Sequence, residues 1–200
     1  MTSLLAVPAA PGFADPVGDA QRAFRGLLDA IAHPGRIVSL DARVAAPAPL
    51  VPAAAAALLT LVDFETPLWL DAAAAAGDAP AWLRFHCGAP IVADPSPARF
   101  ALVSDAAAMP RLDAFAPGED AFPDRSATII VQVGDLHAGD GWRLAGPGIE
   151  TTCRLAVDGL PDWFADALRA NRALYPCGVD LFLAAGDRIA ALPRTTLVEG

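Results

Sequence analysis

The stretch NRALYPCGVDLFLAAGDRIAALPRTT, Asn171–Thr196, decides the fold expected for this chain. Its apolar run Val179–Ala184 is long enough for one strand that is buried on both faces, as in the middle of an α/β sheet. Gly186 and Asp187 suit a two-residue hairpin turn, after which Arg188–Leu192 returns beside the first strand. The stretch therefore predicts a central strand and its antiparallel neighbour.

Two charged residues interrupt this apolar unit, Asp180 inside the strand and Arg194 just past the returning one. A charge in a buried strand is costly unless it is paired. One interpretation is a structural ion pair between Asp180 and either Arg194 or Arg172. The other is a ligand site formed by these three residues with Asn171, because arginine forks suit the oxygens of a phosphonate or phosphate group. The sequence leaves both open.

A helix that opens at Pro161 and ends at Tyr175 leads into this unit, because the residue before a proline is pushed out of helical geometry. Helical spacing places one side of it in the core, together with the amide of Asn171. The residues expected on that inner side are Trp163, Phe164, Ala167, Leu168 and Leu174.

The first helix of the chain is expected after Asp19, which could cap it, and before Pro34. Its apolar side is predicted to face the core with Ala20, Phe24, Leu27, Leu28 and Ile31. Pro80–Cys87 is predicted as a short helix that turns Trp82 and Phe85 inward.

Ser126–Val133, SATIIVQV, is the clearest strand in the middle of the chain because it is rich in β-branched residues. Trp142–Ala145 is expected to pair back against it as a hairpin. Helices and strands alternate throughout, which indicates an α/β layered fold with a mixed sheet. We expect one domain over residues 15–200 and a flexible arm over residues 1–14.

Composition excludes several classes of function. The net charge of −9 argues against nucleic acid as a partner. All fourteen basic residues are arginine, so no internal lysine can hold a Schiff-base cofactor or complete a phosphate-binding loop. The three scattered cysteines, Cys87, Cys153 and Cys177, match no metal-ligand spacing and favour a reduced, cytoplasmic setting. We expect no cofactor and no metal.

A membrane segment is not expected either. Val44–Val62 is a run of uncharged residues, but its prolines leave a helical piece too short to cross a bilayer. We interpret it as a loop followed by a buried helix that begins at Pro52.

Several stretches resemble the PhnH family, the H subunit of the carbon–phosphorus lyase system. Besides NRALYPCGVDLFL and LPRTT, these stretches are AQRAFRGLLDAIAHPG, LLTLVDFETPLWL, WLRFHCGAP, RSATIIVQV and GPGI. They occur in family order over nearly the whole chain. The resemblance implies a three-layer α/β/α fold similar to the large domain of pyridoxal-phosphate-dependent transferases, without their cofactor site.

The resemblance also implies membership of a core complex with the G, I and J subunits, which couples phosphonate to an ATP-derived ribose triphosphate. Similar subunits form homodimers when isolated. Two hypotheses follow. The chain is a subunit that is non-catalytic by itself, or it is a separate enzyme or binding protein with an arginine-lined pocket for a phosphonate or phosphorylated ligand. Whether the four candidate side chains meet in an open pocket discriminates between them.

Overall fold

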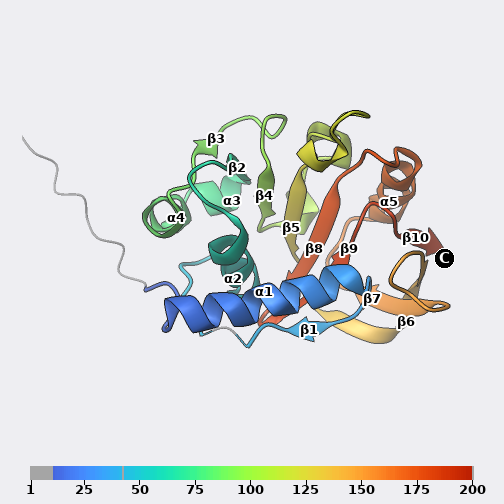
Figure 1. The fold of residues 1–200 in the computed structure, drawn as a ribbon, viewed down its shortest axis with the longest axis horizontal. Coiled ribbons are helices and arrows are strands. Elements are labelled where there is room, and N and C mark those ends of the chain that lie inside the picture. The colour runs from blue at the N-terminus through green and yellow to red at the C-terminus, as the bar shows by residue number, and fades with distance from the viewer. Residues whose placement is uncertain (1–10, 42, 200) are drawn as a thin grey trace, which may run out of the picture.

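The computed structural model describes residues 11–41 and 43–199, and a seven-stranded sheet runs through it (Figure 1). Its strands contain two to six residues each. They are β1 (Val38–Ser39), β2 (Leu68–Leu70), β3 (Ile91–Val92), β4 (Phe100–Val103), β5 (Thr128–Gln132), β8 (Asp180–Ala185) and β9 (Arg188–Leu192).

The strand order is β1-β9-β8-β5-β4-β2-β3. The five strands from β8 to β3 are parallel to one another, whereas β9 is antiparallel to β8 and β1 is antiparallel to β9. The sheet is therefore mixed, as the sequence predicted. The predicted central strand and its returning neighbour are also confirmed, and a turn at Gly186 (φ 58°) joins them.

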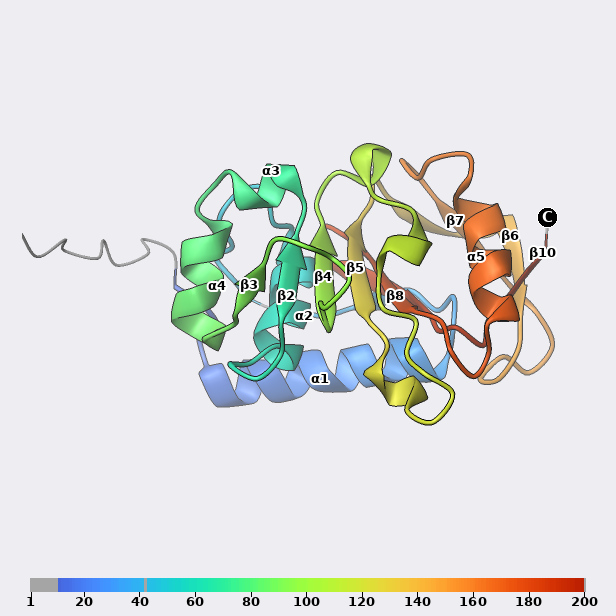
Figure 2. The same cartoon turned by 90° about the horizontal axis from the view of Figure 1, so that it is seen from above.

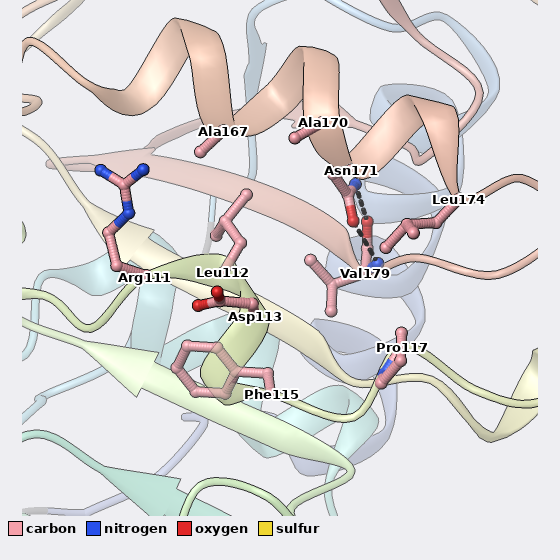
Figure 3. Close-up of a pocket in the computed structure, with 10 residues that line it drawn as sticks. All are labelled: Arg111, Leu112, Asp113, Phe115, Pro117, Ala167, Ala170, Asn171, Leu174 and Val179. Carbon is pink, nitrogen blue, oxygen red and sulfur yellow. Dashed lines mark hydrogen bonds between the residues drawn. The ribbon is translucent and has the colours of Figure 1, made fainter.

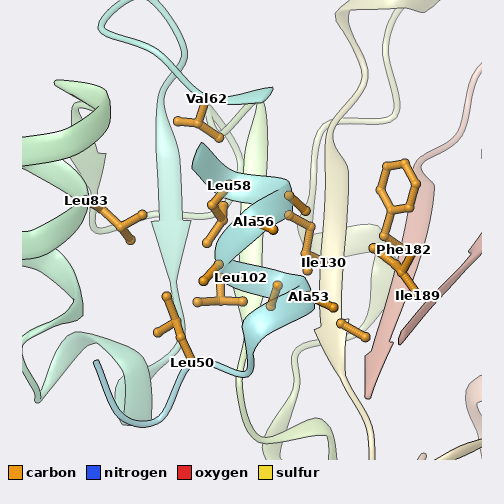
Figure 4. Close-up of a cluster of buried hydrophobic side chains, with 14 of the residues drawn as sticks. Leu50, Ala53, Ala56, Leu58, Val62, Leu83, Leu102, Ile130, Phe182 and Ile189 are labelled. Atoms are coloured by element: carbon orange, nitrogen blue, oxygen red, sulfur yellow. The ribbon is translucent and has the colours of Figure 1, made fainter. Parts of the chain in front are cut away.

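One face of the sheet is covered by helices α1 (Pro16–Ala32), α2 (Pro52–Leu61) and α4 (Ala79–Cys87), with the single turn α3 (Ala72–Ala75) beside them. Five consecutive alanines let α2 lie close against the strands, and its buried side chains meet Leu102, Ile130 and Phe182 (Figure 4). Within the described residues no helix combines the length and apolar character that crossing a membrane would require.

The opposite face is covered by a more varied layer (Figure 2). It contains α5 (Phe164–Ala173), the 3-10 turns η1 (Ala106–Ala108) and η2 (Leu112–Ala114), and a second sheet of order β10-β6-β7. The strands of this small antiparallel sheet are β6 (Leu136–Ala145), β7 (Cys153–Val157) and β10 (Leu197–Glu199). A further 3-10 turn, η3 (Pro123–Arg125), precedes β5.

The small sheet corrects one prediction. Trp142–Ala145 does not pair back against the strand at 126–133; it is the end of β6, which pairs with β7 and β10 instead. The reason is that β6 buries Leu136 and Leu144 in the hydrophobic cluster that also contains Phe164 of α5, so its apolar positions belong to a separate sheet.

The predicted inner face of the first helix is also partly wrong. The helix is capped by Asp15, whose side chain accepts a hydrogen bond from the Gly18 N–H, and not by Asp19. Leu27 is buried, but Phe24 and Leu28 are 50% and 54% exposed. Of the five residues predicted to face inward, Leu27 alone is buried, and Ile31 packs against the core while partly buried.

Two more apolar residues face outward where an inward position was predicted, Phe85 on α4 and Leu174 after α5. In contrast, Trp82, Phe164, Ala167 and Leu168 are buried as predicted. The predicted flexible arm, residues 1–14, lies for the most part outside the described residues.

Candidate functional site

The most elaborate polar cluster ties the amino end of β8 to the segment after β9. Asp180 Oδ1 accepts hydrogen bonds from the backbone N–H of Arg194 at 2.8 Å and from its Nε at 3.1 Å. The Arg194 Nη2 lies 2.5 Å from Asp180 Oδ2. The predicted ion pair between Asp180 and Arg194 is thus confirmed, in a geometry that joins both oxygens of the carboxylate to one guanidinium.

The same guanidinium reaches a third segment of the chain. Its Nη1 donates to the backbone oxygen of Pro123 at 2.7 Å, and its Nη2 also donates to the hydroxyl of Ser126. The side chains of Arg194 and Asp180 are only 14% and 23% exposed. We call these four residues the Arg194 clasp; its donors and acceptors are engaged with one another, as expected of a structural tie.

The other two candidate residues also contact their own chain. The buried Asn171 donates from Nδ2 to the Val179 carbonyl at 2.9 Å, and its Oδ1 accepts the Val179 N–H at 2.8 Å. Arg172 donates from Nε to the Thr195 carbonyl at 3.1 Å, and its guanidinium lies 5.2 Å from the ring centre of Tyr175.

The structure does not bring the four candidates to one open pocket. Asn171 lines a pocket beneath α5, whereas Asp180 lines a different groove beside α1. Ligand binding by Asn171, Arg172, Asp180 and Arg194 therefore stays a prediction, and the contacts recorded for them are internal.

The pocket beneath α5 has a volume of about 310 Å³ and a mostly apolar lining (Figure 3). The methyl groups of Ala167 and Ala170 form its roof, and the segment 111–117 forms the opposite wall. Arg111 lies at one end with its guanidinium carbon 4.3 Å from the ring centre of Trp163, an arrangement that favours cation–π attraction. This geometry can hold an apolar group. Asp113 lines the same pocket, so an arginine and a carboxylate balance each other there.

Sequence reasoning missed this pocket. Arg111 and Asp113 lie in a loop with 3-10 turns that carries no recognised motif, and α5 meets that loop only through the tertiary fold. Ala167 and Ala170 lie three positions apart, on one side of a helix, and such small residues let a neighbouring segment approach. They were a weak signal of the pocket.

The carboxyl ends of the parallel strands are where α/β sheets usually bind ligands, at the point where neighbouring connections leave to opposite faces. Here that point lies between β2 and β4, and Asp71, directly after β2, occupies it. The Asp71 carboxylate is buried and accepts four hydrogen bonds, from the N–H of Ala74 (2.9 Å), Ser104 (2.7 Å) and Asp105 (2.9 Å) and from the Ser104 hydroxyl (2.7 Å). The protein's own side chain therefore occupies the strand ends at this point.

The thiols are not poised for nucleophilic chemistry. Burial raises the pKa of Cys87 to about 11, and the charge of Asp63 adds to the effect. Burial likewise raises the pKa of Cys153 and of Cys177. Across residues 11–41 and 43–199, no three histidine, cysteine or acidic side chains gather in a way that could hold a metal ion.

Comparison with known proteins places the chain. The family model described as "Bacterial phosphonate metabolism protein (PhnH)" matches residues 11–199. The chain is 46% identical over 187 residues to alpha-D-ribose 1-methylphosphonate 5-triphosphate synthase subunit PhnH of Rhizobium meliloti, an alignment that covers 94% of each chain. It is 35% identical over 187 residues to the putative C-P lyase subunit protein HtxG of Stutzerimonas stutzeri, covering 90% of this chain and 85% of that one. With the whole described chain matched in this way, the protein belongs to the PhnH family of bacterial phosphonate metabolism.

Proposed function

We propose that the chain is the H subunit of a ribose 1-methylphosphonate 5-triphosphate synthase and serves bacterial phosphonate breakdown. The printed name of the Rhizobium relative supports this, since that protein is a synthase subunit and is 46% identical along almost its full length. The Stutzerimonas relative is also named as a subunit, a putative one of a C–P lyase. A subunit acts by contacting other chains, so its surface is where support for the role should be sought.

The observation that carries the proposal is an apolar groove beside α1, about 240 Å³ in volume. We call it the α1 groove. Phe24, Leu28 and Ile31 line it from α1, and Phe100 and Phe182 line it from strands β4 and β8. Phe24 and Leu28 are half exposed, although the helix carries them on the side where a core-facing residue would be expected.

Uncovered aromatic and aliphatic side chains that gather in one groove favour a protein partner. The polar lining of the α1 groove consists of Thr128 and Asp180, and the Asp180 carboxylate is already engaged by Arg194. A polar small molecule would find few free hydrogen-bonding groups there. An apolar helix or loop of another chain fits better.

The proposed partners are the G, I and J subunits of the same complex, and the proposed state of the isolated chain is a homodimer that covers the same groove. The proposed location is the cytoplasm, and the chain is non-catalytic by itself. The fold is proposed to be three-layered and related to the large domain of pyridoxal-phosphate-dependent transferases, without their cofactor. The absence of lysine from the chain supports this last point.

The test is co-purification with the other synthase subunits, using Phe24→Glu and Leu28→Glu. A new carboxylate in an apolar contact must be desolvated, so either variant is expected to lower the yield of the complex at least tenfold. Phe85→Glu is the matched control, because it places the same charge at an exposed phenylalanine on another helix.

Light scattering on the isolated chain gives a second measurement. We expect a dimer mass for the unaltered chain and for Phe85→Glu, and a monomer mass for the two groove variants. Variants that assemble as well as the unaltered chain would remove the α1 groove from the interface. An isolated, monomeric chain that turns over a phosphonate unaided would overturn the subunit role itself.

A further inference from the structure

Two loops that are far apart in the sequence enclose a basin of about 610 Å³, within the size range of small-molecule sites. One loop, residues 33–37, follows α1; the other, residues 148–154, leads into β7. We call this cavity the α1–β7 basin. Both loops carry stretches on which the family resemblance rests, AHPG and GPGI.

The walls of the basin are held by close packing. The Cys153 thiol donates to the Pro34 carbonyl at 3.3 Å. Gly148 has a φ of 84°, and a Cβ at that position would lie 2.1 Å from the Ala32 carbonyl oxygen. The two loops therefore meet in a fixed relation, which sets the positions of the side chains that line the space between them.

Three basic side chains line the basin: His33, Arg36 and Arg154. Asp29 on α1 orients the first two, because its Oδ1 lies 2.9 Å from His33 Nδ1 and 3.0 Å from Arg36 Nη1. His33 Nδ1 also lies 3.0 Å from the Asp29 backbone oxygen. Two acceptors around Nδ1 assign the ring hydrogen to that nitrogen, so His33 is held in place by Asp29.

The arginines keep donors for a ligand. Arg154 uses Nη1 for the Gly141 carbonyl at 3.3 Å, and Arg36 uses Nη1 for Asp29. Among the residues that the structure describes, the Nε and Nη2 groups of both arginines donate to no protein atom. Thr151 and Thr152 add two hydroxyl groups to the lining.

The charge of the basin differs from that of the protein as a whole. The chain carries a net charge of −9, yet two arginines and one carboxylate, that of Glu150, line the basin, and a second carboxylate, Asp29, pairs with Arg36 from α1. The pocket beneath α5 instead balances Arg111 with Asp113, and the lining of the α1 groove holds Asp180 and no arginine.

We propose that the α1–β7 basin binds a phosphate-type anion, a phosphonate or the phosphate groups of a phosphorylated sugar. Planar guanidinium groups bind the oxygens of such anions in pairs. The Arg36 and Arg154 forks bind the anion, and the threonine hydroxyls complete its contacts. This inference rests on the proposed function, because the product named for the Rhizobium synthase carries both a phosphonate and a triphosphate.

The test is calorimetric titration of the isolated chain with sodium tripolyphosphate and, separately, with methylphosphonate, at low ionic strength. Arg36→Gln and Arg154→Gln are expected to weaken binding at least tenfold. Arg154→Gln leaves the contacts of Asp29 intact, so it separates loss of a ligand contact from loss of the Asp29 ion pair. Arg143→Gln is the matched control, since it removes the same charge from an exposed arginine on β6 that is paired with Glu199.

Binding of tripolyphosphate alone assigns the basin to the triphosphate, and binding of methylphosphonate alone assigns it to the phosphonate. Three results would overturn the inference: neither probe binds, Arg143→Gln weakens binding as much as the basin variants, or sulfate binds as tightly as both probes. Co-purification with the other synthase subunits, measured on the same variants, keeps this test separate from the proposed function. A chain that assembles normally but binds neither probe refutes the basin alone.

Discussion

Removing the Asp180 carboxylate would test the Arg194 clasp directly. The Asp180→Ala variant lacks the acceptor of three hydrogen bonds, which Arg194 donates from its backbone N–H, Nε and Nη2. The guanidinium would keep the Pro123 carbonyl and the Ser126 hydroxyl as partners, but its charge would stand uncompensated in a largely buried position.

The size of the effect follows from this geometry. Removing one member of a buried ion pair costs about 3–5 kcal/mol of the free energy of unfolding. Arg194 keeps three neutral partners, the Pro123 and Pro176 carbonyls and the Ser126 hydroxyl, and both side chains retain some contact with water, so we expect the lower end, about 3 kcal/mol. For a chain of this length, each kcal/mol lowers the melting temperature by roughly 2–4 °C, which gives about 6–12 °C.

Differential scanning calorimetry would measure this shift. Glu199→Gln is the comparison, because it breaks the exposed pair with Arg143, and such pairs contribute about 0–1 kcal/mol. A fall of less than about 2 °C for Asp180→Ala, or an equal fall for Glu199→Gln, would refute the structural role. An unchanged melting temperature together with loss of activity in the assembled synthase would favour a ligand site at Asp180.

Two further predictions concern other buried groups. Asp71→Ala would leave the N–H groups of Ser104 and Asp105 without their acceptor, and we expect the free energy of unfolding, measured by chemical denaturation, to fall by about 3 kcal/mol. Asp105→Ala is the milder comparison, because the Asp105 side chain caps only a 3-10 turn. Cys87 reacts as the thiolate, so its raised pKa predicts that its rate of alkylation by iodoacetamide rises until about pH 11, whereas in the unfolded chain the rate should level off near pH 9. Mass spectrometry of the labelled peptide measures both rates, and equal pH profiles would contradict the burial argument.

The central strand and its neighbour could be predicted because local signals decide them. An apolar run such as 179–184 must be buried on both faces, and a Gly-Asp turn returns the chain at once. Trp142–Ala145 was assigned to the wrong sheet because alternation shows that a strand has one buried face but not which sheet supplies the partner. The mixed sheet could be foreseen, whereas the second sheet could not.

Similar limits explain the outcome for the sites. The ion pair at Asp180 was predictable because a charge in a buried strand needs a partner and Arg194 is close in the sequence. Periodicity identified the apolar residues of α1 but gave no reason for Phe24 and Leu28 to stay uncovered. The α1–β7 basin depends on two loops that meet only in the folded chain, so no local pattern reveals it.

Asp71 makes the connection between two strands of the sheet independent of any bound ligand. In many α/β proteins the carboxyl ends of the parallel strands form a ligand site, and without the ligand its hydrogen-bond donors face water. Here Asp71 is a permanent internal occupant of the strand ends, and three of its four hydrogen bonds join the end of β2 to the end of β4 whether or not anything else is bound. The framework can therefore reach its final shape before it meets any other molecule, and assembly with other chains can begin from a finished scaffold.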